Sequence, residues 1–164
     1  HDFWSAYFYL HFYTVNTAKL SENVWKEAEK MLEQIQKYPQ KEEYQKLVEA
    51  DRINLYEREA EKGDDRKFLE ETDRVFKENL KGDPAWKLYE RKLVYLESKQ
   101  PDISREFERF LKKYPKVMDA YVEYSIYLCR NNKMTQAQRV YREGRKQTGM
   151  TSKRAEELRR KLGL

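Results

Sequence analysis

The sequence predicts an all-α protein, built from stacked antiparallel helical hairpins in about four repeats and closed by a C-terminal capping helix. Apolar residues recur three and four positions apart, which is the helical period, and no segment sustains the alternation of a strand. Only five Gly and four Pro occur in 164 residues, too few for a turn-rich β protein. Two stretches in the second half of the chain also match each other about 35 residues apart, as units of a repeat do.

The composition agrees with thin helices that each bury one stripe. Charged residues make up 38% of the chain and the mean hydropathy is −1.10, values that alone would suggest disorder. Aromatic residues reach 14%, however, and disordered segments are poor in them. Many charges together with many large aromatic rings favour helices with one apolar face and an otherwise solvated surface.

Turn-forming residues separate the helical segments, which are roughly 12 to 20 residues long. The turns are predicted at 38–40, 62–65, 81–84, 99–102, 113–116, 130–133 and 147–152. Asp83 followed by Pro84 fits an N-cap followed by proline at the first helical position. Asp102 and Ser152 are predicted to cap the starts of two further helices.

Internal similarity defines the repeat. Three aromatic pairs align at a separation of 34 or 35 residues: Trp86 with Tyr121, Tyr89 with Tyr124, and Phe107 with Tyr141. One hairpin cannot bury its stripe alone, so successive hairpins must share a continuous core. We therefore expect a single domain over 1–164, with approximate repeats at 2–39, 40–82, 83–115 and 116–149 and a capping helix at 151–162.

The first two repeats are the least regular. The first is longer than the others, with 14–23 as the expected insertion, and the second carries extra residues around 62–65. The segment 41–62 does not sustain the heptads of a coiled coil. At the other end, Ala155, Leu158 and Leu162 form the thin apolar seam that a capping helix needs.

The fourth repeat carries the resemblance to a known family. Tyr121, Tyr124 and Tyr127, followed by "AQRVYREG" at 137–144, resemble the HAT (half-a-TPR) repeat, a relative of the tetratricopeptide repeat. The chain departs from that pattern at Gln138 and Gly144, and Arg142-Glu143 inverts its usual order. The resemblance implies a right-handed superhelix, and a plain tetratricopeptide array is the alternative.

The aromatic and small residues of the repeats are the candidate core. They are Trp4, Tyr7, Phe76, Trp86, Tyr89, Phe107, Tyr121, Tyr124, Ala137, Val140 and Tyr141. The rings could alternatively be stacking platforms for single-stranded RNA. Their offsets of three and four favour the core, because the same offsets define the buried stripe of each helix.

The resemblance implies a scaffold rather than a catalyst. HAT-repeat proteins are found mostly in nuclear RNA-processing complexes (splicing, 3′-end processing and ribosome biogenesis), where they hold partner proteins together and several form homodimers. We therefore expect a nuclear protein–protein interaction scaffold that binds a partner helix or peptide or pairs with itself. A generic tetratricopeptide adaptor unrelated to RNA is an alternative.

Direct RNA binding is the other alternative, because the basic character of the chain is C-terminal. Residues 139–164 hold nine Lys and Arg against three Glu, whereas the whole chain has a net charge of +5. Basic side chains contact phosphates, although such helices are also commonly solvated faces. The candidate contacts to nucleic acid or to an acidic partner are Arg142, Arg145, Lys146, Arg159 and Arg160.

No pattern in the sequence predicts catalysis, a cofactor or a metal site. There is no Gly-rich phosphate loop or nucleophile elbow, and "EKGDD" at 61–65 lacks the spacing of a calcium loop. The imidazoles of His1 and His11 and the single thiol of Cys129 are expected to be structural or exposed, and one cysteine fits a reducing compartment. The apolar stretch 3–15 is too short to cross a membrane. The chain starts without Met, so we expect it to be part of a longer protein.

Overall fold

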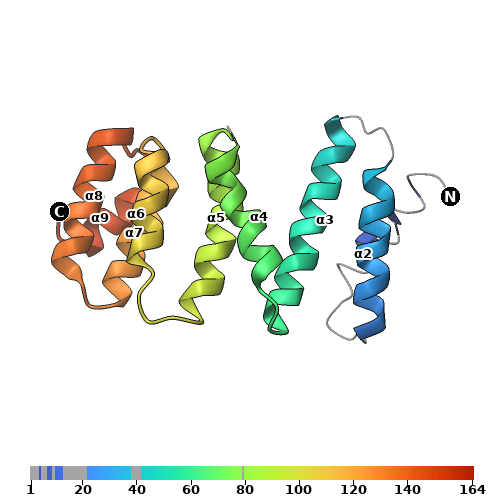
Figure 1. The fold of residues 1–164 in the computed structure, drawn as a ribbon. Helices are drawn as coiled ribbons and strands as arrows, with labels where there is room; N and C mark the ends of the chain where they lie inside the picture. The colour runs from blue at the N-terminus through green and yellow to red at the C-terminus, as the bar shows by residue number, and fades with distance from the viewer. Residues whose placement is uncertain (1–3, 5–6, 9, 13–21, 38–41, 79) are drawn as a thin grey trace. The chain divides into compact units, whose positions relative to one another are not determined.

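The computed structural model is helical throughout its described regular structure, which confirms the all-α prediction (Figure 1). It describes the chain except 1–3, 5–6, 9, 13–21, 38–41 and 79, and it leaves the side chains of 22–25 and 43 undescribed. The described residues between Trp4 and Phe12 are helical as well. The principal helices are α2 (Glu22–Gln36), α3 (Glu42–Glu61), α4 (Arg66–Lys77), α5 (Gly82–Glu97), α6 (Ser104–Lys113), α7 (Met118–Arg130), α8 (Met134–Thr148) and α9 (Lys153–Lys161).

The chain divides into two compact units, His1–Glu71 and Thr72–Leu164. The boundary falls inside α4, within the predicted second repeat at 40–82. Each unit has its own hydrophobic cluster. The single domain over 1–164 and the repeat boundaries stay predictions.

The first unit packs α2 against α3. Ala28, Leu32 and Ile35 lie three and four residues apart on one face of α2, and all three are buried. Val48 and Leu55, two turns apart on α3, join the same cluster. The helical spacing of these aliphatic residues is what directs one stripe of each helix inward.

Trp4 corrects one sequence-based assignment in this unit. It was predicted in the core, but 52% of its surface is exposed. Its ring meets Tyr44 at a centroid distance of 4.9 Å and Tyr7 at 6.1 Å, both in edge-on geometry. Edge-on contacts cover only part of an indole, which leaves the remainder of the ring in solvent. Tyr7 itself is half-buried.

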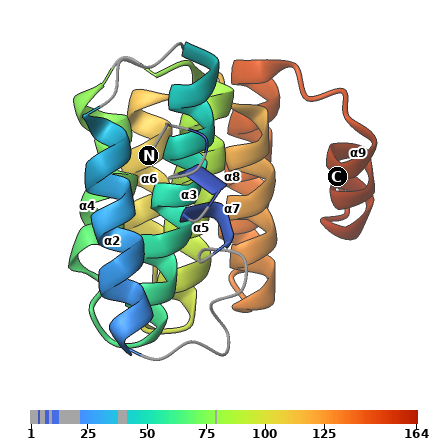
Figure 2. The same ribbon diagram turned by 90° about the vertical axis from the view of Figure 1, so that its right-hand side faces the viewer.

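In the second unit, α7 and α8 form an antiparallel hairpin (Figure 1). Its turn contains Asn132 in the left-handed conformation with φ 58°, which asparagine tolerates better than most residues. Ala137 is fully buried, and its small side chain permits the close approach of the two helices. Figure 2 shows α9, in red, as a separate helix that a loop connects to α8.

Aromatic rings fill the core of the second unit. Phe107 of α6 stacks on Tyr124 of α7 at a centroid distance of 4.8 Å and an interplanar angle of 9°. Phe110 stacks on Tyr89 and meets Trp86 edge-on, at 5.2 Å in both cases. Ring pairs of this geometry add stabilisation beyond the area they bury.

Most of the predicted core lies in this second unit. The buried members are Trp86, Tyr89, Phe107, Tyr121, Tyr124, Ala137 and Tyr141. Phe76 and Val140 are half-buried and pack against the same cluster. The rings therefore serve the core, and Tyr124 in particular already uses one face on Phe107.

Of the three predicted caps, Ser152 is confirmed as the N-cap of α9, whereas Asp102 precedes Ile103, the N-cap of α6, which has no side-chain cap bond. Ser152 accepts a hydrogen bond from the Ala155 amide at 3.2 Å, and Asp102 accepts one from the Ser104 amide at 2.8 Å. The third prediction is also wrong, because α5 begins at Gly82 with Lys81 as its N-cap and no side-chain cap bond. Asp83 lies in the first turn instead, where its charge still complements the helix dipole.

Candidate functional site

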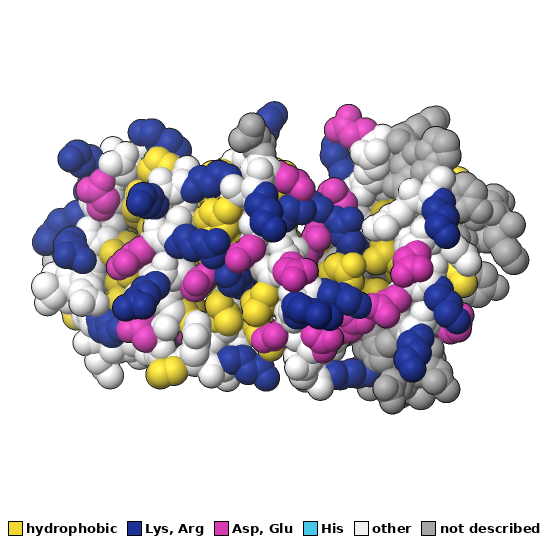
Figure 3. Space-filling model, in the orientation of Figure 1, with side chains coloured by type: hydrophobic (Ala, Val, Ile, Leu, Met, Phe, Trp, Pro, Cys, Tyr) yellow, Lys and Arg dark blue, Asp and Glu magenta, His cyan; other side chains and the backbone are white. Residues whose placement is uncertain are grey.

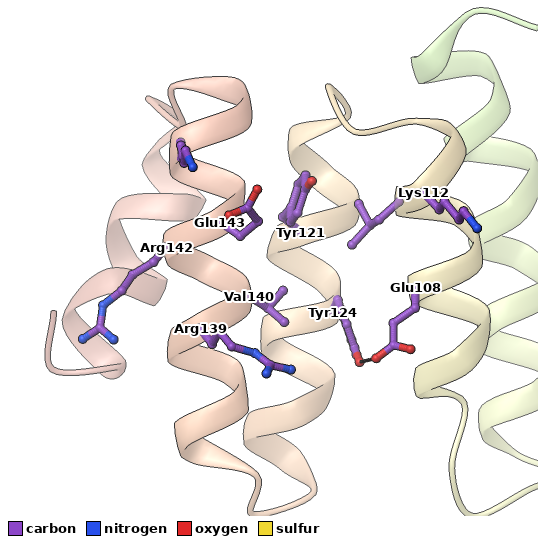
Figure 4. A pocket seen from close by; sticks show the side chains of 10 residues that line it. Glu108, Lys112, Tyr121, Tyr124, Arg139, Val140, Arg142 and Glu143 are labelled. Carbon is purple, nitrogen blue, oxygen red and sulfur yellow. Dashed lines mark hydrogen bonds between the residues drawn. The ribbon is translucent and has the colours of Figure 1, made fainter.

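A groove of about 580 Å³ opens between α6, α7 and α8 in the second unit (Figure 4). Its floor consists of Leu111, Tyr121, Tyr124 and Val140. Its rim carries charged side chains from the two flanking helices: Glu108 and Lys112 from α6, and Arg139, Arg142, Glu143 and Lys146 from α8. The groove thus has an apolar base between two charged walls.

Helical spacing explains why these residues share one site. On α8, positions 139, 142, 143 and 146 are separated by three, one and three residues, so they lie on one face over two turns. On α6, positions 108, 111 and 112 lie together for the same reason. The sequence shows each face separately, but only the packing of α6 and α8 around α7 brings the two faces together.

The tyrosines of the floor are buried, and one of them is hydrogen-bonded to the rim. Tyr121 and Tyr124 are each 5% exposed. The Tyr124 hydroxyl donates a hydrogen bond to Glu108 Oε1 at 3.1 Å, which fixes that carboxylate at the groove edge (Figure 4). Burial raises the pKa of the Tyr124 phenol to about 12, so the hydroxyl stays protonated and remains a donor at neutral pH.

Gly144 determines how closely α8 approaches Tyr121. A Cβ atom at position 144 would lie 2.6 Å from both Cβ and Cγ of Tyr121, and it would also collide with the tip of Met150. Glycine therefore stands here, where the repeat pattern has alanine, because the ring of Tyr121 occupies the space that a methyl group needs. This packing keeps Tyr121 at the base of the groove.

The rim is predominantly basic, with four cations and two carboxylates. Arg139, Arg142, Lys112 and Lys146 form no ion pair with any residue that the structure describes. In Figure 4, Arg139 extends across the groove, whereas Arg142 and Lys112 point outward from its two sides. These exposed cations are available to an anionic partner.

The wider surface of α6 and α8 also has a net positive charge. The two helices together carry eight Lys and Arg against three Glu. In the space-filling view of this unit, on the left of Figure 3, basic side chains outnumber acidic ones and hydrophobic side chains show between them. A surface of this kind favours partners with negative charge and some apolar area.

The structure brings together only part of the basic set that the sequence suggested. Arg142 and Lys146 line the groove, and Arg145 is exposed on the same helix but does not line it. Arg159 lies on α9, where it pairs with Glu156 at 2.7 Å. Arg160 is exposed on α9. Only two of the five residues therefore line the groove, and Arg139 and Lys112 belong to it although the sequence did not single them out.

A second charged cluster connects α4, α5 and α6. Lys92 is only 5% exposed, and its Nζ lies 2.8 Å from Asp73 and 2.8 Å from Glu106. Arg109 reaches Asp73 at 3.2 Å. Burial alone would raise the pKa of Glu106, but hydrogen bonds from Lys92 and Tyr89 lower it overall. The pairing of these charges indicates a structural role rather than an open binding site.

Sequence reasoning missed this cluster, although one signal was present. Lys92 lies between Tyr89 and Leu93, two fully buried or nearly buried members of the α5 stripe, so a charge there requires a partner. The carboxylates that satisfy it come from α4 and α6 and cannot be identified from α5 alone.

A smaller hollow of about 320 Å³ lies between α7, α8 and α9. Its walls include Ile126, Cys129 and Met134, with Arg154 and Glu157 at the edge. Burial raises the pKa of the Cys129 thiol, so the less reactive protonated form is favoured. Met134 is the most exposed apolar side chain of this hollow, at 46%. Arg130 and Lys161 also line this hollow, so its edge is predominantly basic as well, but its volume is smaller than that of the groove.

The described residues offer no further chemical centre. His11 contacts the buried carboxylate of Asp51 at 3.1 Å, and its ring stacks on Tyr7. Nowhere in the described part of the chain do three or more His, Cys, Asp or Glu side chains gather as metal ligands would. Among the described helices, none combines the length and hydrophobicity of a membrane span.

Comparison with known proteins does not extend this description. No protein-family model, curated protein or solved structure matches the chain. The groove and the resemblance of the repeat pattern are therefore the two features that bear on function.

Proposed function

We propose that this chain is a protein–protein interaction scaffold of a nuclear RNA-processing complex, made of stacked hairpins of the HAT type. The observation that carries the scaffold role is the groove between α6, α7 and α8, with its apolar floor and its charged rim. Grooves between helices that combine these two properties receive helices or peptides of partner proteins. The nuclear RNA-processing setting comes from the resemblance of the repeat pattern alone.

The repeat geometry supports the scaffold role in a second way. In hairpin arrays the large residues are buried in the core between successive hairpins. Each added hairpin therefore extends the surface and does not form a catalytic cavity. Tyr89, Tyr121 and Tyr141 follow this rule, since each is at most 5% exposed. The surface is left to charged side chains, which select partners by complementarity.

The test is affinity purification of the full-length protein with and without nuclease treatment. The proposal predicts that identified RNA-processing proteins co-purify and that they persist after RNA is digested. Partners from an unrelated process would favour a generic tetratricopeptide adaptor. Recovery that depends entirely on intact RNA would overturn the scaffold role.

Direct RNA binding is the second candidate, and the excess of basic residues on α6 and α8 favours it. Binding through phosphates weakens steeply as salt increases, because counterions released from the nucleic acid drive it. Titration of single-stranded RNA at low and at physiological ionic strength measures this directly. Absence of binding at low salt would remove this candidate.

Self-association is a further expectation of the resemblance. Light scattering of the chain over a range of concentrations gives its mass in solution. A mass that rises to twice 20.1 kDa would support pairing. A constant monomer mass at high concentration would remove the homodimer from the proposal.

A further inference from the structure

We propose that the groove between α6 and α8 binds an acidic amphipathic helix of a partner protein, with one bulky aliphatic side chain inserted between Leu111 and Val140. This inference rests on the proposed scaffold function and names the chemistry of its partner. It depends on the shape of the groove, the nature of its floor and the arrangement of its charges.

The shape fits a side chain carried by a helix. The volume of about 580 Å³ lies within the range of pockets that enclose compact ligands, roughly 300–1,000 Å³. The groove is bounded on two sides by α6 and α8 and closed below by α7 (Figure 4). A partner helix lying along it can therefore insert one side chain while its backbone stays outside.

The floor selects an aliphatic group rather than a nucleobase. Leu111 and Val140 are half-buried and provide apolar contact without a flat surface. Tyr124 has one face stacked on Phe107 and is 5% exposed, so it does not offer an open platform for stacking. An aliphatic side chain that packs against Leu111 and Val140 contributes to the binding free energy, because apolar area is removed from water.

The charges select carboxylates at helical spacing. Arg139, Arg142 and Lys146 lie along α8 over seven residues, about 10 Å at 1.5 Å per residue. Acidic side chains separated by three or four positions on a partner helix repeat over the same length. Such a helix can therefore place carboxylates near Arg139 and Lys146, while Arg142, which points outward on the α8 side, adds positive charge at the outer edge. Arginine adds geometric preference, since its guanidinium pairs with a carboxylate through two hydrogen bonds.

Two carboxylates of this chain lie at the same groove, and they favour an acidic helix over RNA as the ligand. Glu108 is held at the edge by Tyr124, and Glu143 accepts a hydrogen bond from Gln147 at 2.6 Å on the α8 side. A continuous phosphate backbone would bring negative charge close to both. A helix can avoid them, because it places acidic residues only at chosen positions.

The experiment is selection from a displayed library of random peptides of about 16 residues, enough for four helical turns. The bait is the whole chain, and the comparison bait carries Arg139→Glu and Arg142→Glu. Both positions are exposed, so the double change leaves the core intact, and circular dichroism verifies this. The expected result is enrichment of sequences with Asp or Glu spaced three or four apart around Leu or Ile, and loss of that enrichment with the variant.

Affinity of one selected peptide then locates the site. The double variant should weaken binding about tenfold or more, because it replaces attraction by repulsion at two rim positions. Arg160→Glu on α9 is the matched control and should leave affinity unchanged, since it alters charge outside the groove. Val140→Thr, which keeps the shape of the side chain but adds a hydroxyl, should weaken binding without changing its dependence on salt.

Several outcomes would overturn the assignment. They are no enrichment, enrichment without acidic residues, equal weakening by Arg160→Glu, or binding of single-stranded RNA that the peptide does not displace. The same double variant in the full-length protein separates the two proposals. If identified protein partners remain bound to it, the groove assignment fails and the scaffold function stands. If the unaltered protein has no protein partner, the scaffold function itself fails.

Discussion

Replacement of Gly144 by alanine tests how closely α7 and α8 are packed. Alanine is the better helix former by about 1 kcal/mol, and the HAT pattern carries it at this position, so local reasoning predicts stabilisation. The structure predicts the opposite. The added Cβ would lie 2.6 Å from Cβ of Tyr121, an atom next to the backbone that moves only if the helices separate. The tip of Met150 is also in the way, but it can rotate aside.

The magnitude follows from these two opposing effects. Insertion of a methyl group into a packed core typically costs about 1–3 kcal/mol. The upper part of this range applies, because the obstacle at Tyr121 is close to the backbone. After subtraction of the gain in helix propensity, the variant should be destabilised by about 1–2 kcal/mol.

The assay is urea unfolding of the whole chain, combined with hydrogen exchange of the α7 and α8 amides. Exchange should accelerate in these helices, because the loss of stability is local to their interface. Arg145→Ala is the control: it changes helix propensity at the adjacent exposed position and should alter stability by less than about 0.5 kcal/mol. If Gly144→Ala is as stable as the parent or more stable, the close packing of Tyr121 against α8 is wrong.

Three further changes test the core and its charges. Trp86→Ala should cost about 3–5 kcal/mol in urea unfolding, as a buried aromatic does, and a loss below about 1 kcal/mol would mean that the ring is a surface feature. Lys92→Met should cost about 2–3 kcal/mol, less than for a fully buried pair because Asp73 and Glu106 are partly solvated; no loss would mean that the ion pairs contribute nothing. A hydrogen bond from Lys133, with another from Ser104, holds the pKa of Asp102 well below its usual value of 3.8. Asp102→Asn should therefore destabilise the chain by up to about 1 kcal/mol at pH 7, with the deficit shrinking as pH falls below about 4; a deficit that is independent of pH would contradict the role of this charge.

The repeat pattern and the helix signals could be read directly from the sequence. The period of apolar residues predicted all-α structure, and the paired rings at Trp86 and Tyr121 predicted buried positions. Ser152 was predicted as a cap and is one. These features are local, since spacing along one helix determines which face is apolar and which residue precedes its first turn.

The structure differs from the sequence-based predictions where residues from another part of the chain affect where a helix begins or how far a side chain is buried. Gly82 starts α5 one residue before Asp83. A Cβ atom at Gly82 would lie 2.7 Å from Val117, a constraint that no local signal contains. Trp4 matches the repeat spacing, yet its edge-on neighbours leave it half-exposed.

The sequence by itself therefore determined the helices, their buried stripes and the basic character of the C-terminal part. Only the tertiary structure decided which charges are enclosed and which face a groove. Lys92 is buried because α4 and α6 supply carboxylates beside it, and Arg139 faces the groove because α6 lies opposite α8 across α7. The physical reason is that burial and charge pairing depend on distances between helices, whereas sequence periodicity describes one helix at a time.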